Sequence, residues 1–450
     1  MIDGDAGEEC GVVGIWTPGV DVAELLTDGL FALQHRGQES AGISVGDKNG
    51  IVTRLGMGLV AEVLRAEVTS GLRGHVGIGH VRYSTSAGSS LDNAQPFHER
   101  DSWRPDFALA HNGNLTELPV PARVGAAGDG GARSDTRRLA SLLGPEPGTL
   151  GDAMAAVLPR TRGAFSLVGV SSGALLAARD PHGFRPLSLG RLPDGGWAVA
   201  SETAALDGLG ATGQRDVEPG ELVEIDEHGV HTRQFAAAKP ALCVFEHVYF
   251  ARPDSVIGGR SVFSVRDALG AALARHEPAD ADVVIPVPDT ARVAALGYAR
   301  ESGIPYGEGL FRSTYANRSF IQPSPGERRR AVRLKLRPIA PAVAGRRVVV
   351  VDDSIVRATS MRHVVALLRE AGAAEVHVRV ASPPVRWPCF FGVDIGSARE
   401  LVAVRLEPAE IAELVGADSL GYLPAAAMVA AASGSTGFCT ACFTGDYPAR

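Results

Sequence analysis

Cysteine is scarce in this sequence, and no long apolar segment is present. Five cysteines occur among 450 residues. No apolar run reaches the roughly 18 residues that a transmembrane helix needs. The segment Met1–Glu9 has acidic side chains but no basic one, so it lacks the positive charge of a secretory signal or transit peptide. These absences predict a cytoplasmic chain with no membrane span, whose cysteines serve purposes other than disulfide bonds.

Positive charge is also in short supply. Lys and Arg total 44 against 51 Asp and Glu, which gives a net charge of −7. This balance argues against general nucleic-acid binding. The length and the 45% hydrophobic content are typical of a globular protein with two or more domains. Residues 236–240 are the best candidate for a linker, so we predict domains over residues 10–238 and 239–450.

The clearest strand–loop–helix pattern lies in the second half of the chain. Val348–Val351 is a run of four β-branched residues, typical of a buried parallel strand. Asp352 and Asp353 end that strand, and a helix is predicted over residues 361–371. A second apolar run, residues 376–381, completes a β–α–β unit.

The carboxyl end of this strand is a candidate site for a phosphorylated sugar. In an open parallel sheet, ligands bind where the strands end. The carboxylates of Asp352 and Asp353 suit ribose hydroxyls or a magnesium ion. The following loop offers backbone N–H groups, a helix N-terminus and the hydroxyls of Ser354, Thr359 and Ser360, which together suit a phosphate. The alternative interpretation is a strand end with two solvated aspartates.

A second apolar strand, residues 283–287, is followed by Thr290. The Thr290 hydroxyl is placed to join Asp352 and Asp353 around Mg²⁺. An equally good interpretation is that Thr290 only caps the helix predicted over residues 291–302.

Residues 352–360 resemble the phosphoribosyl-pyrophosphate (PRPP) loop of type I phosphoribosyltransferases, in the version of the amidophosphoribosyltransferase family. That family usually continues with Gly-Thr-Thr, where this chain has Ala358, Thr359 and Ser360. A Cβ atom in a left-handed conformation costs roughly 1–2 kcal/mol. If Ala358 adopts that conformation, we expect an active enzyme with a raised Michaelis constant for PRPP.

A long polar segment, residues 315–336, resembles the flexible loop that closes over PRPP in the family. Arg312, Ser313 and Thr314 precede it where the family usually shows Lys-Asn-Arg. One cation is therefore lost, which puts some phosphate or nucleotide contacts in doubt. The alternative for the segment is a solvated basic loop.

Cys10 begins an apolar strand directly after Met1–Glu9. It is either a buried structural cysteine or a nucleophile that becomes N-terminal when the leader is removed. A terminal cysteine carries its own base, because the free α-amine has a pKa of about 8 and lies near the thiol. Further stretches resemble, together with Cys10, the glutaminase domain of N-terminal-nucleophile amidotransferases over roughly residues 10–235: residues 33–43, 79–85, 110–115 and 134–136.

This resemblance implies a role for each of four polar residues. The Asn112 side chain and the Gly113 N–H would form the oxyanion hole. Arg82 would pair with the α-carboxylate of glutamine, and Asp135 would hold its α-ammonium group. The alternatives are a turn, a surface charge and a helix cap. Residues 179–187 and 200–203 also resemble this domain, and we interpret them as structural turns.

The other cysteines are all in the second half: Cys243, Cys389, Cys439 and Cys442. The last two form a C-x-x-C pair, which alone is compatible with redox chemistry or metal binding. Four cysteines suit a tetrahedral metal or an iron–sulfur cluster, and their chemistry does not choose between zinc and iron. Residues 387–392 and 438–445 resemble the branch of the family that carries a structural 4Fe–4S cluster and a cleaved propeptide, which would here be residues 1–9. The alternative is four unrelated buried cysteines.

The resemblance spans nearly the whole chain and implies its architecture and activity. We expect an α+β N-terminal-nucleophile glutaminase sandwich followed by an α/β type I phosphoribosyltransferase domain. The implied reaction converts PRPP, glutamine and water into 5-phosphoribosylamine, glutamate and pyrophosphate, the first step of de novo purine synthesis. Purine nucleotides are expected as feedback inhibitors, and a homo-oligomer, by resemblance a tetramer, as the assembly.

Two other functions remain open from the sequence. One is an amidotransferase that delivers ammonia to a sugar phosphate or an acyl adenylate. The other is a non-catalytic or altered-substrate paralogue that binds PRPP or nucleotide. The departures at Ala358 and at residues 312–314 keep the second alternative open.

Overall fold

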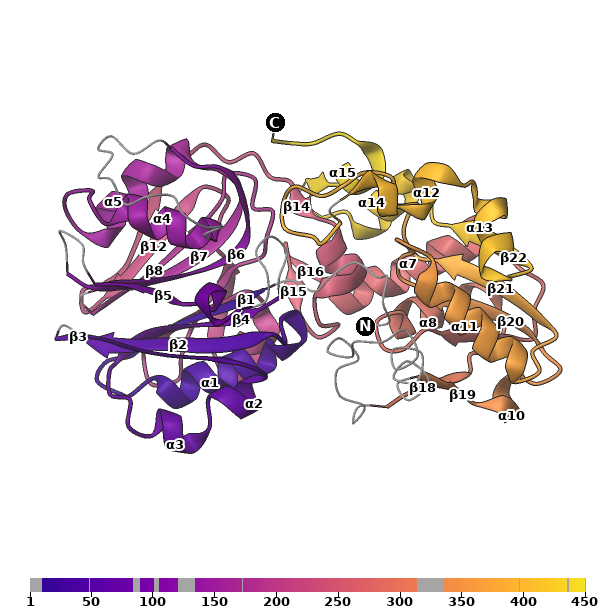
Figure 1. Ribbon diagram of the computed structural model, residues 1–450, viewed down its shortest axis with the longest axis horizontal. Helices are drawn as coiled ribbons and strands as arrows, with labels where there is room; N and C mark the ends of the chain where they lie inside the picture. Colours follow the sequence, from indigo (N-terminus) through magenta and orange to yellow (C-terminus); the bar gives the residue numbers. More distant parts are fainter. Residues whose placement is uncertain are drawn as a thin grey trace.

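The computed structural model describes most of the chain as two lobes that lie side by side (Figure 1). The described residues are 10–47, 49–83, 90–100, 105–119, 134–171, 173–313, 336–395, 397–434 and 437–449. The predicted propeptide, residues 1–9, and residues 315–335 of the predicted PRPP lid lie outside them. Among the described helices, none is both long and apolar enough to cross a membrane.

The first lobe is built from two stacked antiparallel sheets. A seven-stranded sheet has the order β11-β9-β10-β1-β4-β2-β3 and a six-stranded sheet the order β13-β12-β8-β7-β6-β5. The first sheet contains β1 (Gly11–Trp16), β2 (Ser40–Asp47), β3 (Gly50–Met57), β4 (Val76–Arg82), β9 (Ser188–Arg191), β10 (Trp197–Ala200) and β11 (Thr212–Asp216). The second contains β5 (Phe97–Glu99), β6 (Phe107–Glu117), β7 (Arg162–Ser171), β8 (Ala174–Arg179), β12 (Glu221–Asp226) and β13 (Gly229–Gln234).

Three hydrophobic layers hold this sandwich together. Side chains such as Val12, Ala110 and Val168 are fully buried between the two sheets. The outer face of the seven-stranded sheet packs on α1 (Ala23–Ala32), α2 (Val60–Val63) and α6 (Thr203–Gly208), with α3 (Ala66–Thr69) beyond them. The outer face of the other sheet packs on α4 (Asp135–Leu143) and α5 (Leu150–Val157). The expected glutaminase-type sandwich is thus confirmed.

The second lobe contains a parallel four-stranded sheet. Its order is β17-β20-β21-β22, formed by Val283–Pro286, Arg347–Asp352, Glu375–Val380 and Ser419–Tyr422. Val349 and Val351 pack on one face, and Val348 and Val350 on the other. Burial on both faces explains why this strand is a continuous run of valines instead of an alternating pattern.

Helices cover both faces of the parallel sheet. One face packs on α7 (Val262–His276), α8 (Arg292–Ser302) and α14 (Ala425–Ala432), and the other on α10 (Ala340–Val343), α11 (Thr359–Glu370), α12 (Val402–Arg405) and α13 (Pro408–Val415). Helix α11 begins two residues before the predicted start. The expected α/β phosphoribosyltransferase-type domain is confirmed.

Short elements connect the two lobes. The pair β14 (Leu242–Cys243) and β23 (Phe438–Cys439) is parallel, and β15 (Val256–Ile257) pairs with β16 (Arg260–Ser261). A π-helical turn, Glu246–Phe250, follows β14, and α15 (Ala441–Thr444) follows β23. Figure 1 shows β14, β15 and β16 between the lobes, with the C-terminal segment returning toward them. The ribbon β18 (Leu310–Arg312) and β19 (Leu336–Pro338) lies at the bottom of the second lobe in Figure 1.

Helices α7 and α8 cross at two glycines that leave no room for a side chain. A Cβ atom on Gly270 would lie 1.9 Å from the carbonyl oxygen of Ala294. A Cβ atom on Gly297 would lie 2.1 Å from the carbonyl oxygen of Asp267. The two backbones therefore touch, and this contact fixes the position of α8, which follows the loop that carries Thr290.

We expect Gly270→Ala to lower the free energy of unfolding by about 1–3 kcal/mol, the usual cost of overpacking a well-packed core. Urea unfolding of the purified chain measures this change. The matched control is Gly208→Ala in α6, where no atom lies within 4 Å of the added Cβ. The control should be neutral or slightly stabilising, because alanine favours helices. Equal stabilities for the two variants would contradict the close-contact argument.

Candidate functional site

Cys10 lies immediately before β1, at the end of the sandwich that faces the second lobe. Its thiol is half-buried and donates to the carbonyl oxygen of Tyr83 at 3.5 Å. Its own carbonyl oxygen accepts a hydrogen bond from Nε of Arg36 at 3.1 Å. Gly11 pairs with Val81 in the adjacent strand, so the nucleophile candidate lies beside the end of β4.

Arg82 is the last residue of β4 and is 5% exposed. The alternative interpretation of Arg82 as a surface charge is therefore wrong. Its guanidinium lies 3.8 Å from the carboxylate of Glu39. The turn before Glu39 packs tightly on this strand end, because a Cβ atom on Gly37 would lie 2.6 Å from the Arg82 backbone. A fixed, buried arginine beside the thiol is suited to binding a carboxylate.

Asn112 and Gly113 lie within β6, so the alternative of a turn at these residues is wrong. Asn112 is 1% exposed, and its Nδ2 has no hydrogen-bond partner among the described residues. Burying an unsatisfied donor is costly, so such a group requires an explanation. Gly113 has a φ of +139°, and a Cβ atom there would lie 2.2 Å from the carbonyl oxygen of Ala164. Two donors, one of them without a partner in the described chain, are what an oxyanion hole requires.

Asp135 is tied to the same strand. Its Oδ2 accepts from the backbone N–H of Leu115 at 2.9 Å and lies 3.7 Å from Nδ1 of His111. The cap of α4 is Ser134, whose side chain accepts from the N–H of Arg137. The alternative interpretation of Asp135 as the helix cap is therefore wrong.

His80 connects the two sheets at this end, and it was not among the residues selected from the sequence pattern. Its Nε2 donates to the carbonyl oxygen of His111 at 3.1 Å. His80 is two residues before Arg82, and His111 is next to Asn112. Burial, helped by the nearby charge of Arg82, lowers the pKa of His80 to about 3. His80 is therefore a neutral donor that holds β4 against β6.

The second candidate site lies where β20 ends. Asp352, Asp353 and Ser354 are 8%, 9% and 3% exposed, so the alternative of two solvated aspartates is wrong. Oγ of Ser354 donates to Oδ1 of Asp353 at 2.8 Å, and the N–H of Asp353 donates to Oδ1 of Asp352 at 3.0 Å. Thr359 and Ser360 begin α11 directly after this loop. Acidic groups and a helix N-terminus therefore meet, as the pattern predicted.

Thr290 follows the neighbouring strand β17, so it belongs to the same edge of the sheet. The residue before α8 is Ala291, and no side chain caps that helix; Thr290 is therefore not its cap. Among the described residues, no group of three or more His, Cys, Asp or Glu side chains is arranged to hold a metal ion. A magnesium ion here would need further oxygen ligands, such as those of a bound pyrophosphate.

Ala358 adopts the left-handed conformation on which the expected rise in the Michaelis constant for PRPP depends. Its φ is 62° and its ψ is 0°, and it immediately precedes α11. Within the described chain it is the one non-glycine residue with positive φ. Strain of this kind concentrates at ligand sites. Arg312, at the second departure, lies 3.8 Å from Asp289.

The four cysteines of the second lobe converge from three segments. Cys243 and Cys439 are register partners in the β14–β23 pair. The carbonyl oxygen of Cys442 accepts from the N–H groups of Arg386 and Trp387 at 3.0 Å, which brings α15 to the Cys389 loop.

Burial and mutual repulsion act on these thiols. Burial, and then the charges of Cys243, Cys389 and Cys439, raise the pKa of Cys442 well above its usual range. Burial raises the pKa of Cys439 to about 11. Four thiols that oppose one another's ionisation suit a cationic centre that would bind them as thiolates. The four thiols are therefore near one another in space, and their binding of a cluster stays a prediction.

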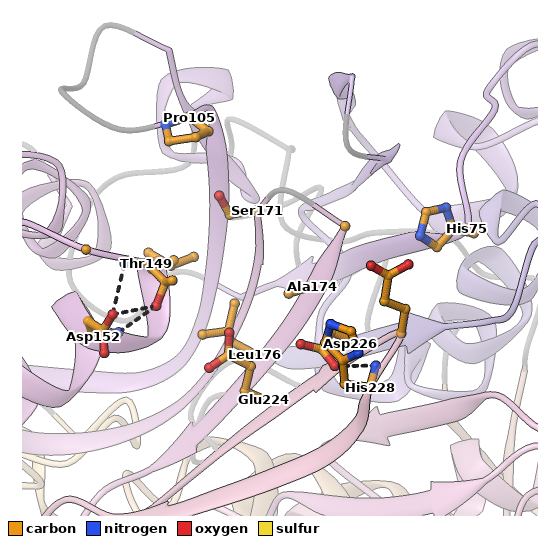
Figure 2. A pocket seen from close by; sticks show the side chains of 14 residues that line it. His75, Pro105, Thr149, Asp152, Ser171, Ala174, Leu176, Glu224, Asp226 and His228 are labelled. Atoms are coloured by element: carbon orange, nitrogen blue, oxygen red, sulfur yellow. Dashed lines mark hydrogen bonds between the residues drawn. The ribbon is translucent and has the colours of Figure 1, made fainter.

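A separate cavity of about 520 Å³ opens at the opposite side of the sandwich and contains none of the predicted site residues (Figure 2). It is lined by acidic and histidine side chains, including Asp152, Glu224, Asp226, His75 and His228. Burial, with the neighbouring Asp226 and Asp152, raises the pKa of Glu224. The chemistry predicted from the sequence therefore lies elsewhere, at the two sites described above.

Comparison with known families matches both halves of the chain. A glutamine amidotransferase domain matches residues 80–208, and a phosphoribosyl transferase domain matches residues 264–382. The first range contains Arg82, Asn112 and Asp135, and the second contains Asp352 and Ala358.

Full-length relatives and solved structures agree with this pairing. The chain is 50% identical to an amidophosphoribosyltransferase of Mycobacterium bovis, over 98% of this chain and 86% of the relative. It is 42% identical to that of Methanothermobacter thermautotrophicus, over 99% and 96%. A solved glutamine PRPP amidotransferase from B. subtilis, complexed with ADP and GMP, superposes with a TM-score of 0.88 at 40% identity, over 98% of each chain. The chain therefore belongs to the amidophosphoribosyltransferase family.

Proposed function

We propose that Cys10 hydrolyses glutamine and that the released ammonia displaces pyrophosphate from PRPP at the Asp352–Ser360 loop. The observation that carries the first part is the buried amide of Asn112, whose Nδ2 has no partner among the described residues. It lies next to Gly113 and at the same end of the sandwich as Cys10 and Arg82. A donor held out of water and without a partner is suited to a charge that develops only during reaction.

Removal of residues 1–9 would give Cys10 a free α-amine. That amine would take the thiol proton, so that the thiolate attacks the side-chain amide carbon of glutamine. Asn112 and Gly113 would stabilise the oxyanion of the tetrahedral intermediate, which collapses to a thioester and releases ammonia. Water would then hydrolyse the thioester to glutamate. Arg82 and Asp135 would hold the α-carboxylate and α-ammonium groups.

At the second site, the carboxylates of Asp352 and Asp353 would bind the ribose hydroxyls or a magnesium ion, with Thr290 beside them. The backbone N–H groups and hydroxyls at the start of α11 would bind the 5-phosphate. Magnesium, when bound, would neutralise charge on the pyrophosphate as it leaves. Ammonia would pass inside the protein and attack C1 of the ribose, giving 5-phosphoribosylamine.

The four cysteines have the ligand chemistry of a 4Fe–4S cluster with a structural role, although among the described residues they are not arranged as a metal-holding group. Cys243, Cys389, Cys439 and Cys442 supply four sulfur ligands, and the N–H of Phe391 donates to Sγ of Cys389 at 3.3 Å. Hydrogen bonds to ligating sulfur are typical of such sites. The cluster would tie the C-terminal segment and the Cys389 loop to β14. A cytoplasmic location would keep the thiols reduced.

Purine nucleotides are the proposed inhibitors, since the B. subtilis structure contains ADP and GMP. A homo-oligomer, and a tetramer in particular, is proposed from the family resemblance alone.

Asn112→Ala tests the oxyanion hole. We expect kcat for PRPP-dependent glutamate release to fall by about 10²–10³-fold, the usual effect of deleting one such donor. The Michaelis constant for glutamine should change little, because Arg82 and Asp135 remain. The matched control is Asn49→Ala, on an exposed turn, which should keep full activity. Absence of PRPP-dependent glutamate release by the unmodified chain would overturn the proposed function itself.

Cys439→Ser tests the cluster. Chain purified without oxygen should contain about four irons, as a 4Fe–4S cluster requires, and the variant should lose iron and thermal stability. Cys10→Ser is the matched control, because it changes the one cysteine outside the group: it should keep its iron and lose glutamine hydrolysis. Zinc in place of iron in active protein would refute this assignment.

Ala358→Gly tests the strained PRPP loop. Glycine removes a left-handed strain of about 1–2 kcal/mol, so the Michaelis constant for PRPP should fall several-fold while PRPP-independent glutaminase activity stays the same. The control is Ala371→Gly at the other end of α11, where φ is −79° and glycine relieves nothing. If PRPP affinity does not change, the strain does not bear on binding; if neither form turns over, a non-catalytic paralogue is favoured.

A further inference from the structure

Four charged side chains are completely buried where the two lobes meet. We call Arg36, Arg185, Glu202 and Glu246 the interdomain ion cluster; the side chain of each is 0% exposed. Three of them come from the first lobe, and Glu246 comes from the turn that opens the second. Charged residues are almost never buried completely unless they are paired, so the arrangement is a specific one.

Glu246 binds Arg36 through two hydrogen bonds. Nη2 of Arg36 donates to Oε1 of Glu246 at 2.9 Å, and Nη1 donates to Oε2 at 3.0 Å. Nη1 also donates to Oε1 of Glu202 at 2.6 Å. The remaining Nε donates to the carbonyl oxygen of Cys10 at 3.1 Å. The two Nη atoms of Arg36 are thus held by Glu246, while its Nε holds the backbone of Cys10.

Glu202 keeps its charge in this buried place. Burial favours its neutral form, but the charges of His35 and Arg36 outweigh that effect and hold the pKa of Glu202 below its usual range. Its Oε2 also accepts from Oγ of Ser255 at 2.7 Å and from the N–H of Arg252 at 2.9 Å. Glu202 therefore joins the two lobes.

Glu246 also binds Arg185, which holds a loop of the second lobe. Nη1 of Arg185 lies 3.5 Å from Oε1 of Glu246. Nε and Nη2 of Arg185 donate to the carbonyl oxygen of Phe391 at 3.1 and 2.6 Å. The ring of Phe391 stacks on Phe184 at 4.2 Å, so the loop is anchored by charge and by packing.

The same loop lies directly against the oxyanion strand. Nδ2 of Asn114 donates to the carbonyl oxygen of Phe390 at 2.9 Å. A Cβ atom on Gly392 would lie 3.3 Å from Cα of Gly113 and 3.2 Å from Nη2 of Arg185. The contact between loop and strand therefore leaves little room for a side chain at position 392, and a shift of the loop would move the backbone N–H proposed to bind the oxyanion.

We propose that Glu246 is a positioning residue for glutamine hydrolysis, which aligns Cys10 through Arg36 and the Gly113 backbone through Arg185. The inference rests on the proposed roles of Cys10 and Gly113. It makes the glutaminase site incomplete without a carboxylate from the phosphoribosyltransferase half of the chain.

The chemistry of Glu246 explains why an isosteric amide is a sharp test. A carboxylate has two acceptor oxygens, and here both are used by guanidinium groups. Glutamine offers one acceptor, so its NH₂ group would replace either Oε2, which accepts from Arg36, or Oε1, which accepts from both Arg36 and Arg185. Glu246→Gln therefore keeps the shape but removes a hydrogen bond to Arg36 in either orientation, and in the second orientation the one to Arg185 as well.

The experiment compares two nitrogen sources in the full-length, cluster-containing chain. With glutamine, we expect kcat of Glu246→Gln to fall by about tenfold to a hundredfold, the loss that a misplacement of about 1 Å produces. The Michaelis constant for glutamine should stay within about twofold. With ammonium chloride in place of glutamine, formation of phosphoribosylamine should also stay within about twofold, because the second site is untouched.

Glu407→Gln is the matched control. Glu407 belongs to the second lobe, and its exposed carboxylate lies 3.5 Å from Arg386, so both rates should match those of the unmodified chain. An equal loss with glutamine and with ammonium in Glu246→Gln would assign the ion cluster a structural role only and overturn the proposal. An unchanged kcat with glutamine would overturn it as well. Failure of the unmodified chain to hydrolyse glutamine would instead refute the proposed function.

Asn114→Ala keeps the proposal testable if Glu246→Gln does not fold. Asn114 is only partly buried, and its replacement loosens the Phe390 loop without removing a buried charge. The proposal expects a lower kcat with glutamine and an unchanged rate with ammonium. Equal kcat values for Asn114→Ala and the unmodified chain would overturn it.

Discussion

The pairing of buried charges between Arg36, Glu246 and Arg185 is the constraint on which the arrangement of the two lobes depends. A carboxylate with no contact to water must be matched by cations, and each of these guanidinium groups has donors left over. Those donors hold backbone carbonyls, of Cys10 in one case and of Phe391 in the other. Because the buried carboxylate of Glu246 must be paired with both arginines, it also fixes the two segments that they hold, the one at Cys10 and the one at Phe391.

The two lobes meet this constraint with different architectures. The antiparallel sandwich places its chemistry at strand ends and within β6, where His80 and Asp135 bring residues from separate elements together. The parallel sheet places its chemistry where β20 ends, because the strand must be apolar on both faces until Asp352. The second site is thus located by the point at which burial of apolar side chains stops.

Much of the second site could be predicted from local sequence. The valine run, the two aspartates and the helix start are contiguous, so a pattern of about a dozen residues determines their geometry. The left-handed conformation of Ala358 was also considered, as the condition under which its Cβ atom would be strained, and the structure shows that conformation. The predicted helix start was wrong by two residues, because helix boundaries depend on the loop before them.

The contacts that join the sites could not be predicted, because they connect residues far apart in sequence. Arg36 and Glu246 are 210 positions apart, and Asn114 and Phe390 are 276 apart; neither pair has a local signal. The loop that carries Cys389 illustrates the consequence. Its cysteine belongs to the proposed metal cluster, while its next three residues contact Asn114, Arg185 and Gly113. Whatever holds Cys389 in place therefore also limits the movement of β6, so the proposed cluster and the strand with the proposed oxyanion donors share one support.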